Sequence, residues 1–230
     1  MNNLEQLENN IGVVFKNKDL LLQALVHRSY LNENPKFRLG HNERLEYLGD
    51  AVLELVVTEH LYEKYPQMAE GEMTTLRAAL VNAKTLSEIS GKLGVNDFLL
   101  LSRGEAKDIG RARQYILANT FESIVGAMYI DSGIDAPKKF LNSVLLPALP
   151  KILEMKLYRD PKSLFQEEAQ EKTSITPSYE VLKEWGPDHD KHFIIGVFLG
   201  KELVAEGEGP SKQAAQEDAA RHALEAKGWG

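Results

Sequence analysis

The chain has 230 residues, of which 43% are hydrophobic and 27% charged, a composition that supports a packed core and excludes a wholly disordered protein. It contains no cysteine, which excludes disulfide scaffolds, thiolate metal sites and thiol nucleophiles. No apolar run approaches the roughly 20 residues that cross a bilayer, and the first residues do not resemble a secretory signal, so we expect a cytoplasmic protein with no membrane partner. The formal net charge of −7 argues at first sight against a nucleic-acid partner, because phosphate binding needs clustered lysine and arginine.

Helical periodicity dominates the first two thirds of the chain. Apolar positions recur at spacings of three and four in residues 20–26, 45–61, 76–93 and 116–130, with glycine and proline between these segments. No segment there alternates with the two-residue period of a strand. We therefore predict an all-α domain over residues 1–153.

The pattern changes after this domain. Residues 154–162 are polar and are interpreted as a linker, and residues 163–230 are predicted to form a separate small α+β domain. Its expected order is helix, three strands and helix, at 163–172, 179–185, 192–199, 202–206 and 211–226. The second strand alternates with Phe193, Ile195, Val197 and Leu199 on one face, and the last helix has an alanine stripe at Ala215, Ala219, Ala223 and Ala226.

The segment HNERLEYLGDAVL, residues 41–53, carries an unusual acidic face. At 100° per residue, Glu43, Glu46 and Asp50 fall within about 60° of one another, with apolar side chains opposite, at Leu45, Leu48, Val52 and Leu55. Neighbouring carboxylates raise one another's pKa, and a divalent cation such as Mg²⁺ or Mn²⁺ removes that cost. A solvated acidic face with salt bridges explains this helix equally well. Gly49 predicts that another backbone or a ligand comes close.

A second helix, at residues 116–129, is apolar on nearly all sides and is therefore expected to be buried. It nevertheless places Asn119 and Glu122 on one face. A buried glutamate needs a partner, because an unpaired buried charge is strongly disfavoured. A metal site shared with the acidic face of the first helix would supply that partner. Pairing of Glu122 with Arg77 or another arginine remains the alternative.

Three segments resemble the ribonuclease III family: HNERLEYLGDAVL, YILANTFESIVGAMYIDSG and a C-terminal stretch similar to a double-stranded-RNA-binding domain. The resemblance implies a homodimeric, Mg²⁺-dependent endonuclease for double-stranded RNA, with Mn²⁺ able to substitute. It implies products with 5′-phosphate and 3′-hydroxyl ends and short 3′ overhangs, in the processing of rRNA and mRNA precursors. The implied catalytic residues are Glu43, Asp50 and Glu122, and the implied metal ligands are Glu46, Asp50, Asn119 and Glu122. Glu70 matches a further acidic residue near the family's site.

Asn119 departs from the family, which usually has aspartate at this position. The residue is interpreted as a tolerated variant with weaker metal affinity, an engineered substitution, or the mark of a chain that binds RNA without cutting it. We favour an active site because the other carboxylates are intact. The main alternative function is a catalytically impaired double-stranded-RNA-binding protein. A hydrolase of small phosphorylated molecules would leave the second domain unexplained.

The second domain must recognise A-form RNA through its shape, phosphates and 2′-hydroxyl groups. The resemblance implies RNA contacts from Gln166 and Glu167 on the first helix, His189 and Lys191 in the loop between the first two strands, and Ser211 and Lys212 at the start of the last helix. Family members usually have further basic residues after Lys212, where this chain has Gln213, Ala214 and Gln216. We therefore predict weaker and less salt-sensitive RNA binding than is typical. Lys107, Arg111 and Arg113 form a basic segment that either approaches the RNA backbone or is a plain exposed loop.

Overall fold

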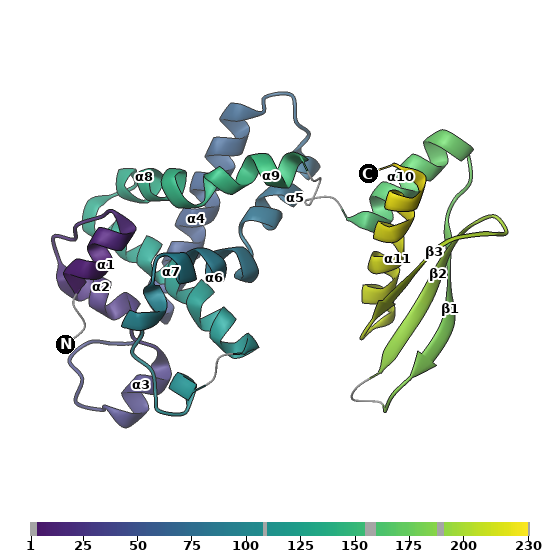
Figure 1. The fold of residues 1–230 in the computed structure, drawn as a ribbon. Helices are drawn as coiled ribbons and strands as arrows, with labels where there is room; N and C mark the ends of the chain where they lie inside the picture. The colour runs from purple at the N-terminus through teal and green to yellow at the C-terminus, as the bar shows by residue number, and fades with distance from the viewer. Residues whose placement is uncertain (1–3, 108–109, 155–159, 188–190, 230) are drawn as a thin grey trace. The chain divides into compact units, whose positions relative to one another are not determined.

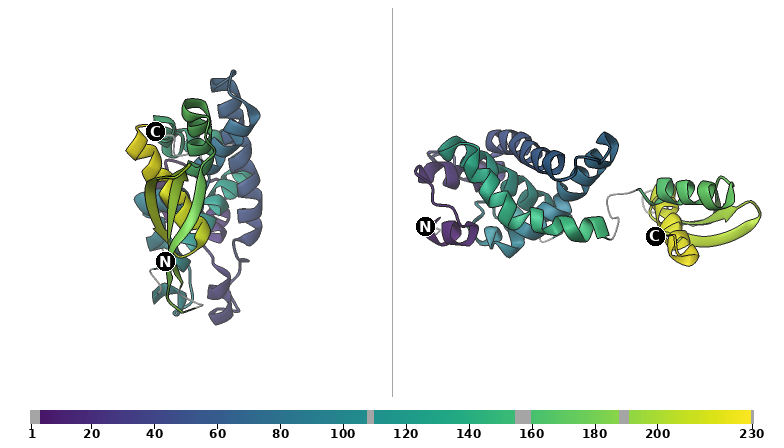
Figure 2. Two further views of the ribbon diagram at one scale, coloured as in Figure 1. Left: turned by 90° about the vertical axis from the view of Figure 1, so that its right-hand side faces the viewer. Right: turned by 90° about the horizontal axis from the view of Figure 1, so that it is seen from above.

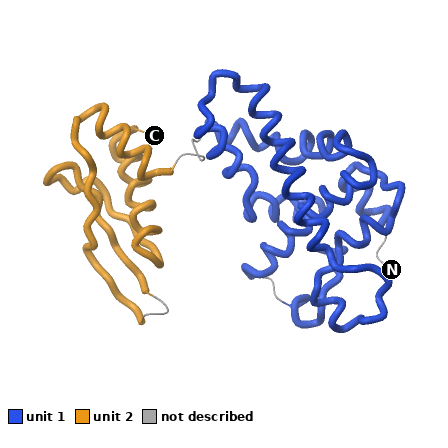
Figure 3. Tube along the Cα trace, turned by 180° about the vertical axis from the view of Figure 1, so that it is seen from behind, with its two compact units in different colours: residues 1–155 blue, residues 156–230 orange. Residues whose placement is uncertain are grey.

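The computed structural model describes residues 4–107, 110–154, 160–187 and 191–229. The chain forms two compact units, residues 1–155 and 156–230, shown in blue and orange in Figure 3. None of the helices in the described ranges is long and apolar enough to cross a membrane.

The first unit is helical, as predicted (Figure 1). Its α-helices are α1 (Leu4–Ile11), α2 (Lys18–Ala24), α3 (Arg28–Glu33), α4 (Glu43–Lys64), α5 (Glu70–Leu80), α6 (Ala83–Lys92), α7 (Arg111–Ser132), α8 (Asp135–Val144) and α9 (Leu149–Glu154). Short 3-10 turns lie at Val95–Phe98, Glu105–Lys107 and Leu146–Ala148. The segment at residues 76–93, expected as one helix, is divided between α5 and α6. The division occurs because the side chain of Asn82 caps a new helix, accepting a hydrogen bond from the backbone N–H of Thr85 at 3.0 Å.

The crossing of α4 and α7 positions the acidic residues. A Cβ atom on Gly49 would lie 1.7 Å from the carbonyl oxygen of Glu122, and one on Gly126 would lie 2.2 Å from the carbonyl oxygen of Leu45. Only glycine allows two backbones to approach so closely. The close approach predicted at Gly49 is therefore confirmed, and the neighbour is the backbone of α7.

Burial on the two crossing helices agrees with their sequence patterns at most positions, although Tyr129, the last residue of the segment expected to be buried, is 39% exposed. Phe121, Ile124 and Val125 on α7 are at most 1% exposed, as expected for a helix that is apolar on nearly all sides. Leu45 and Val52 on α4 are buried as well. Leu55 was expected on the same apolar side, but it is 58% exposed, because it falls on the face of α4 that carries the exposed Tyr47 and Tyr62.

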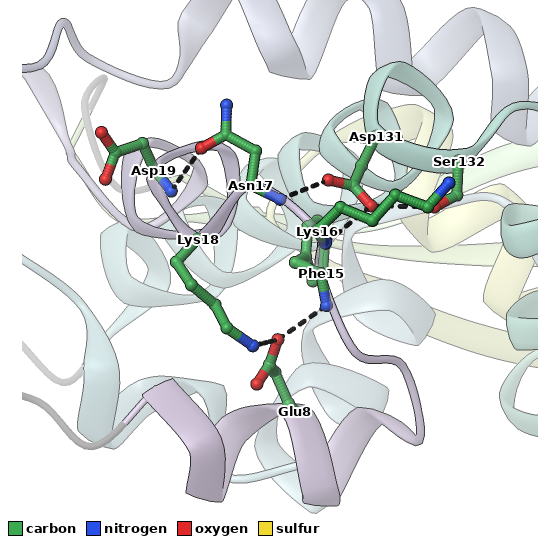
Figure 4. A network of polar contacts seen from close by, with 8 residues as sticks. All are labelled: Glu8, Phe15, Lys16, Asn17, Lys18, Asp19, Asp131 and Ser132. Atoms are coloured by element: carbon green, nitrogen blue, oxygen red, sulfur yellow. Dashed lines mark hydrogen bonds and ion pairs between the residues drawn. The ribbon is translucent and has the colours of Figure 1, made fainter.

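Polar contacts tie the N-terminal segment to the end of α7 (Figure 4). The Asp131 carboxylate accepts hydrogen bonds from the backbone N–H groups of Lys16 and Asn17, at 3.1 and 2.8 Å. Glu8 on α1 forms an ion pair with Lys18 at the start of α2. These contacts hold α1 and α2 against α7, the helix that carries Asn119 and Glu122.

The second unit follows the predicted order of helix, three strands and helix. Its elements are α10 (Pro161–Thr173), β1 (Ser178–Trp185), β2 (His192–Leu199), β3 (Glu202–Gly209) and α11 (Lys212–Lys227). The strands form one antiparallel sheet in the order β1-β2-β3, and both helices cover the same face of it (Figures 1 and 2). Helix α10 begins two residues before its predicted start, because Asp160 caps it through the backbone N–H of Ser163 at 2.9 Å.

The core of this unit lies between the helices and the sheet. Phe193, Ile195, Val197 and Leu199 are all buried on the helix-facing side of β2, as the alternation predicted. Most of the predicted alanine stripe of α11 is also buried: Ala215, Ala219 and Ala223 are 0% exposed. Ala226, however, is exposed, and Ala220 is buried instead. The buried face shifts in the last turn, so that Leu224 rather than Ala226 completes the contact.

Candidate active site

The candidate active site lies where α4 crosses α7. Glu43 and Glu46 stand in the first turn of α4, and Asp50 follows one turn later, on the same side. Glu122 and Asn119 project from α7, whose backbone touches α4 at Gly49. Glu46, Asn119 and Glu122 are half-buried, whereas Glu43 and Asp50 are exposed. The structure thus brings together the residues of both helices that the sequence pattern singled out.

The carboxylates influence one another strongly. Burial, together with the negative charges of Asp50 and Glu46, raises the pKa of Glu122 to about 7. Burial and the charges of Glu43 and Asp50 also raise the pKa of Glu46, although a side-chain hydrogen bond with Asn119 partly opposes this effect. Both pKa shifts have the same cause: partial burial and neighbouring negative charges disfavour the charged carboxylate form.

The chemistry of these side chains fits a divalent cation. Carboxylate and amide oxygens are the ligands of Mg²⁺ and similar hard cations. A bound cation would offset both the burial of Glu122 and the repulsion by Asp50 and Glu46, which together raise the pKa of Glu122. In the described parts of the chain, however, no three acidic or histidine side chains already converge on one point. The Asn119 side chain is hydrogen-bonded to Glu46, which links the two helices at this place. Glu46, Asp50, Asn119 and Glu122 are the side chains whose oxygen atoms suit such a cation.

The alternative partner of Glu122, an arginine, is engaged elsewhere. The guanidinium group of Arg77 donates a hydrogen bond to the Thr58 hydroxyl at 2.8 Å and lies 3.7 Å from the carboxylate of Glu54. Arg77 therefore neutralises Glu54 rather than Glu122.

A pocket of about 310 Å³ opens beside the carboxylates. Its described lining consists of His27, Arg28, Asn42, Glu43, Glu46, Tyr115, Ile116 and Asn119. The carboxylate of Glu43 lies 3.7 Å from both Arg28 and the Nδ1 atom of His41. Glu70 belongs to a separate hollow of about 190 Å³ with Thr58, Tyr62 and Arg77, so within one chain it does not line this pocket.

Sequence reasoning did not select His27, Arg28 or Tyr115 as site residues. Helix α3, which begins at Arg28, has only 6 residues and carries no periodic signal. Tyr115 directly precedes the segment that was expected to be buried, but its side chain is 47% exposed. A contact between segments distant in sequence places His27 and Arg28 there, because the backbone N–H of Asn42, at the start of α4, donates a hydrogen bond to the Val26 carbonyl at 2.9 Å.

The residues predicted to bind RNA lie on the second unit. Gln166 and Glu167 are exposed on α10, and Ser211 caps α11 by accepting a hydrogen bond from the backbone N–H of Ala214 at 3.1 Å. Lys212 is exposed, with its Nζ atom 5.7 Å from the centre of the Phe193 ring. His189 lies outside the described residues.

Glu184, which sequence reasoning missed, stands between the two predicted lysines. Lys191 donates a hydrogen bond to its carboxylate at 2.9 Å. That bond and the positive charges of Lys191 and Lys212 lower the pKa of Glu184. The two lysines therefore share a nearby negative charge, which reduces the positive potential that they present to RNA.

The comparisons with known proteins agree with these features. A ribonuclease-III-like family model matches residues 17–149, and a double-stranded RNA binding motif matches residues 161–227. The chain is 43% identical over 224 residues to Ribonuclease 3 of Carboxydothermus hydrogenoformans, covering 97% of this chain and 95% of that relative. It is 41% identical over 224 residues to Ribonuclease 3 of Nitratiruptor sp., covering 97% and 96%.

A solved structure also resembles the first unit. The nuclease domain of ribonuclease III from Campylobacter jejuni matches with a TM-score of 0.58 and 39% identity, over 64% of this chain and 99% of that one. The family models and the full-length relatives cover both units of the chain. The chain therefore belongs to the ribonuclease III family, and it is a ribonuclease that carries its own double-stranded-RNA-binding domain.

Proposed function

We propose that this ribonuclease uses Mg²⁺, or Mn²⁺ in its place, to hydrolyse phosphodiester bonds in both strands of double-stranded RNA. The products would carry 5′-phosphate and 3′-hydroxyl ends with short 3′ overhangs. The observation that carries the proposal is the carboxylate set at the crossing of α4 and α7, where burial and the charges of Asp50 and Glu46 raise the pKa of Glu122 to about 7. Such crowding is costly unless a cation is bound there.

The residues have distinct parts in this proposal. Glu46, Asp50, Asn119 and Glu122 would hold the cation, and Glu43 borders the substrate side of the same face. Bound Mg²⁺ would supply Lewis-acid activation of water and electrostatic stabilisation of the phosphate oxygens. At neutral pH the cation-free Glu122 holds a proton for much of the time, so binding of the cation would release that proton.

Asn119 is compatible with an active site. Its amide oxygen is a neutral ligand, and its hydrogen bond to Glu46 already orients one of the carboxylates. An aspartate in its place would add a further negative charge to the crowded set. We infer that Asn119 weakens metal binding without removing the reaction.

We propose that two copies of the chain assemble into a homodimer. Tyr47, Leu55 and Tyr62 lie on one face of α4 and are 84%, 58% and 71% exposed. Ile130 is 52% exposed, and with Tyr47 it lines a hollow of about 620 Å³. Large apolar side chains exposed on one face favour an interface, and a two-fold axis would give a dimer with one site for each RNA strand. The similar nuclease domain from Campylobacter jejuni has a structurally flexible region that is involved in dimer formation.

The second unit would hold the duplex for the first. Its predicted contacts are Gln166, Glu167, His189, Lys191, Ser211 and Lys212, which suit recognition of shape and phosphates rather than of base sequence. The relatives are bacterial proteins, so we place the reaction in the cytoplasm, on duplex segments of rRNA and mRNA precursors.

A cleavage assay on end-labelled duplex RNA tests the proposal. The natural chain should cut both strands when Mg²⁺ is present, and the label should map the ends and overhangs. Glu122→Gln should lose cleavage, whereas Glu63→Gln, a change of an exposed glutamate near the other end of α4, should not. Binding without cleavage by the natural chain, with cutting gained by Asn119→Asp, would instead support the impaired RNA-binding protein.

A further inference from the structure

The pocket beside the carboxylates has two chemically different walls. Glu43 and Glu46, from α4, form an acidic wall. The pocket lining also includes the cation Arg28 and the polar rings of His27 and Tyr115. Glu43 and Glu46 alone would repel RNA phosphates. A neighbouring positive charge would therefore help an RNA strand to enter the pocket.

Arg28 is the fixed positive charge in the described lining of this pocket. Burial lowers the pKa of His27, which makes His27 a neutral ring at pH 7. The Arg28 side chain is 73% exposed and lies 3.7 Å from the carboxylate of Glu43, which is 48% exposed. Exposed ion pairs contribute only about 0–1 kcal/mol, so Arg28 exchanges this partner readily for a stronger one.

A phosphate is such a partner, because the guanidinium fork donates two parallel hydrogen bonds to its oxygens. The position of Arg28 also suits a phosphate. Its partner Glu43 is one helical turn from Glu46, about 5–6 Å between Cβ atoms. Neighbouring phosphates along an RNA strand are separated by a distance of the same order.

Tyr115 provides a second polar group on this side of the pocket. Its hydroxyl accepts a hydrogen bond from the guanidinium group of Arg111 at 3.3 Å, which polarises the O–H bond toward donation. The pocket therefore combines a cation and a hydrogen-bond donor next to the candidate metal ligands Glu46 and Asn119.

We propose that this pocket is a subsite for the phosphate adjacent to the scissile one, and that Arg28 binds that phosphate after leaving its ion pair with Glu43. The proposal rests on the proposed function of the carboxylate site. It assigns to α3, a helix outside the α4–α7 crossing, the placement of the strand along the cleavage centre.

Charge removal from the RNA tests this contact directly. Duplexes with one cleavage site are made with a neutral methylphosphonate at each phosphate flanking the scissile one, in turn. Single-turnover cleavage by the natural chain should slow by about 10-fold or more at one flanking position, the order expected for a lost charge-assisted contact. Arg28→Ala should cut the unmodified duplex with a similar loss and show no additional loss at that position. Arg28→Lys should recover part of the rate, because it restores the charge without the fork.

Arg38→Ala is the matched control, because Arg38 is another exposed arginine of the first unit and pairs with Asp19 instead. It should keep the natural rate and the natural sensitivity to the neutral linkage. Normal cleavage by Arg28→Ala would overturn the proposal. So would a slow variant that is still sensitive to the methylphosphonate, because Arg28 would then act only through Glu43. Failure of the natural chain to cut any duplex would instead refute the proposed function, and the same RNA series would then be compared by binding affinity.

Discussion

Glu122→Gln should stabilise the metal-free protein while removing cleavage. In the folded chain the pKa of Glu122 is raised from 4.5 to about 7. Between these pH values the native state therefore binds more protons than the unfolded state. The free energy of unfolding then falls as the pH rises through this interval, and the full loss is present above pH 7. Glutamine has the same shape and no charge, so it avoids this loss.

The size of the effect follows from the shift. The interval between 4.5 and about 7 corresponds to roughly 3 kcal/mol at 1.36 kcal/mol per pH unit. Glu122 is half-buried, and solvent screening reduces the expected gain to about 1–2 kcal/mol. For a unit of this size that gain corresponds to a rise in melting temperature of about 2–8 °C. At pH 4.5 the two proteins should unfold at nearly the same temperature.

Differential scanning calorimetry in the presence of a chelator, at pH 8 and at pH 4.5, measures the difference. Both tryptophans, Trp185 and Trp229, lie in the second unit, so tryptophan fluorescence follows that unit alone and should not change. Glu63→Gln controls for the loss of one exposed carboxylate. Equal or lower stability of Glu122→Gln at pH 8, or an equal gain at both pH values, would refute the electrostatic reasoning.

Three further changes test other parts of the structure. Asn119→Asp should lower the Mg²⁺ concentration for half-maximal cleavage several-fold, because a charged ligand replaces a neutral one; an unchanged Mg²⁺ titration would count against Asn119 as a ligand. Gly126→Ala should lower the free energy of unfolding by about 1–3 kcal/mol or more, because its Cβ would lie 2.2 Å from the Leu45 carbonyl oxygen; an unaltered melting temperature would contradict the tight crossing. Lys212→Ala should weaken duplex binding and reduce its salt slope by about 1, and an unchanged slope would show that Lys212 makes no phosphate contact.

Local patterns predicted most of the fold because they report burial directly. The alternation in β2 and the apolar surface of α7 both describe side chains that the core must cover, and both are confirmed. The division of residues 76–93 depended on a single cap, Asn82, which the apolar period did not register. Leu55 was misplaced for a different reason: a pattern of apolar residues cannot distinguish a face buried within the chain from one exposed on it.

The residues of the candidate site also differ in whether a local sequence pattern could predict them. Glu43, Glu46 and Asp50 were predictable because one helix fixes their spacing, and Gly49 indicated that a second backbone lies near. Arg28 was not predictable, because it begins a short helix without a period, and a hydrogen bond between residues far apart in sequence, Asn42 N–H to the Val26 carbonyl, brings that segment to the pocket.

The net charge of −7 is less informative than where the charges lie. Part of the negative charge is concentrated at the crossing of α4 and α7, where it raises the pKa of Glu122 and favours cation binding. On the second unit, Glu184 accepts a hydrogen bond from Lys191 and lies near Lys212, so these lysines present less positive potential than their number implies. In the first unit, bound cations and Arg28 would offset the acidic surface that a duplex meets. Overall acidity therefore does not exclude an RNA substrate, and we expect recognition at the α4–α7 crossing to depend on divalent cations.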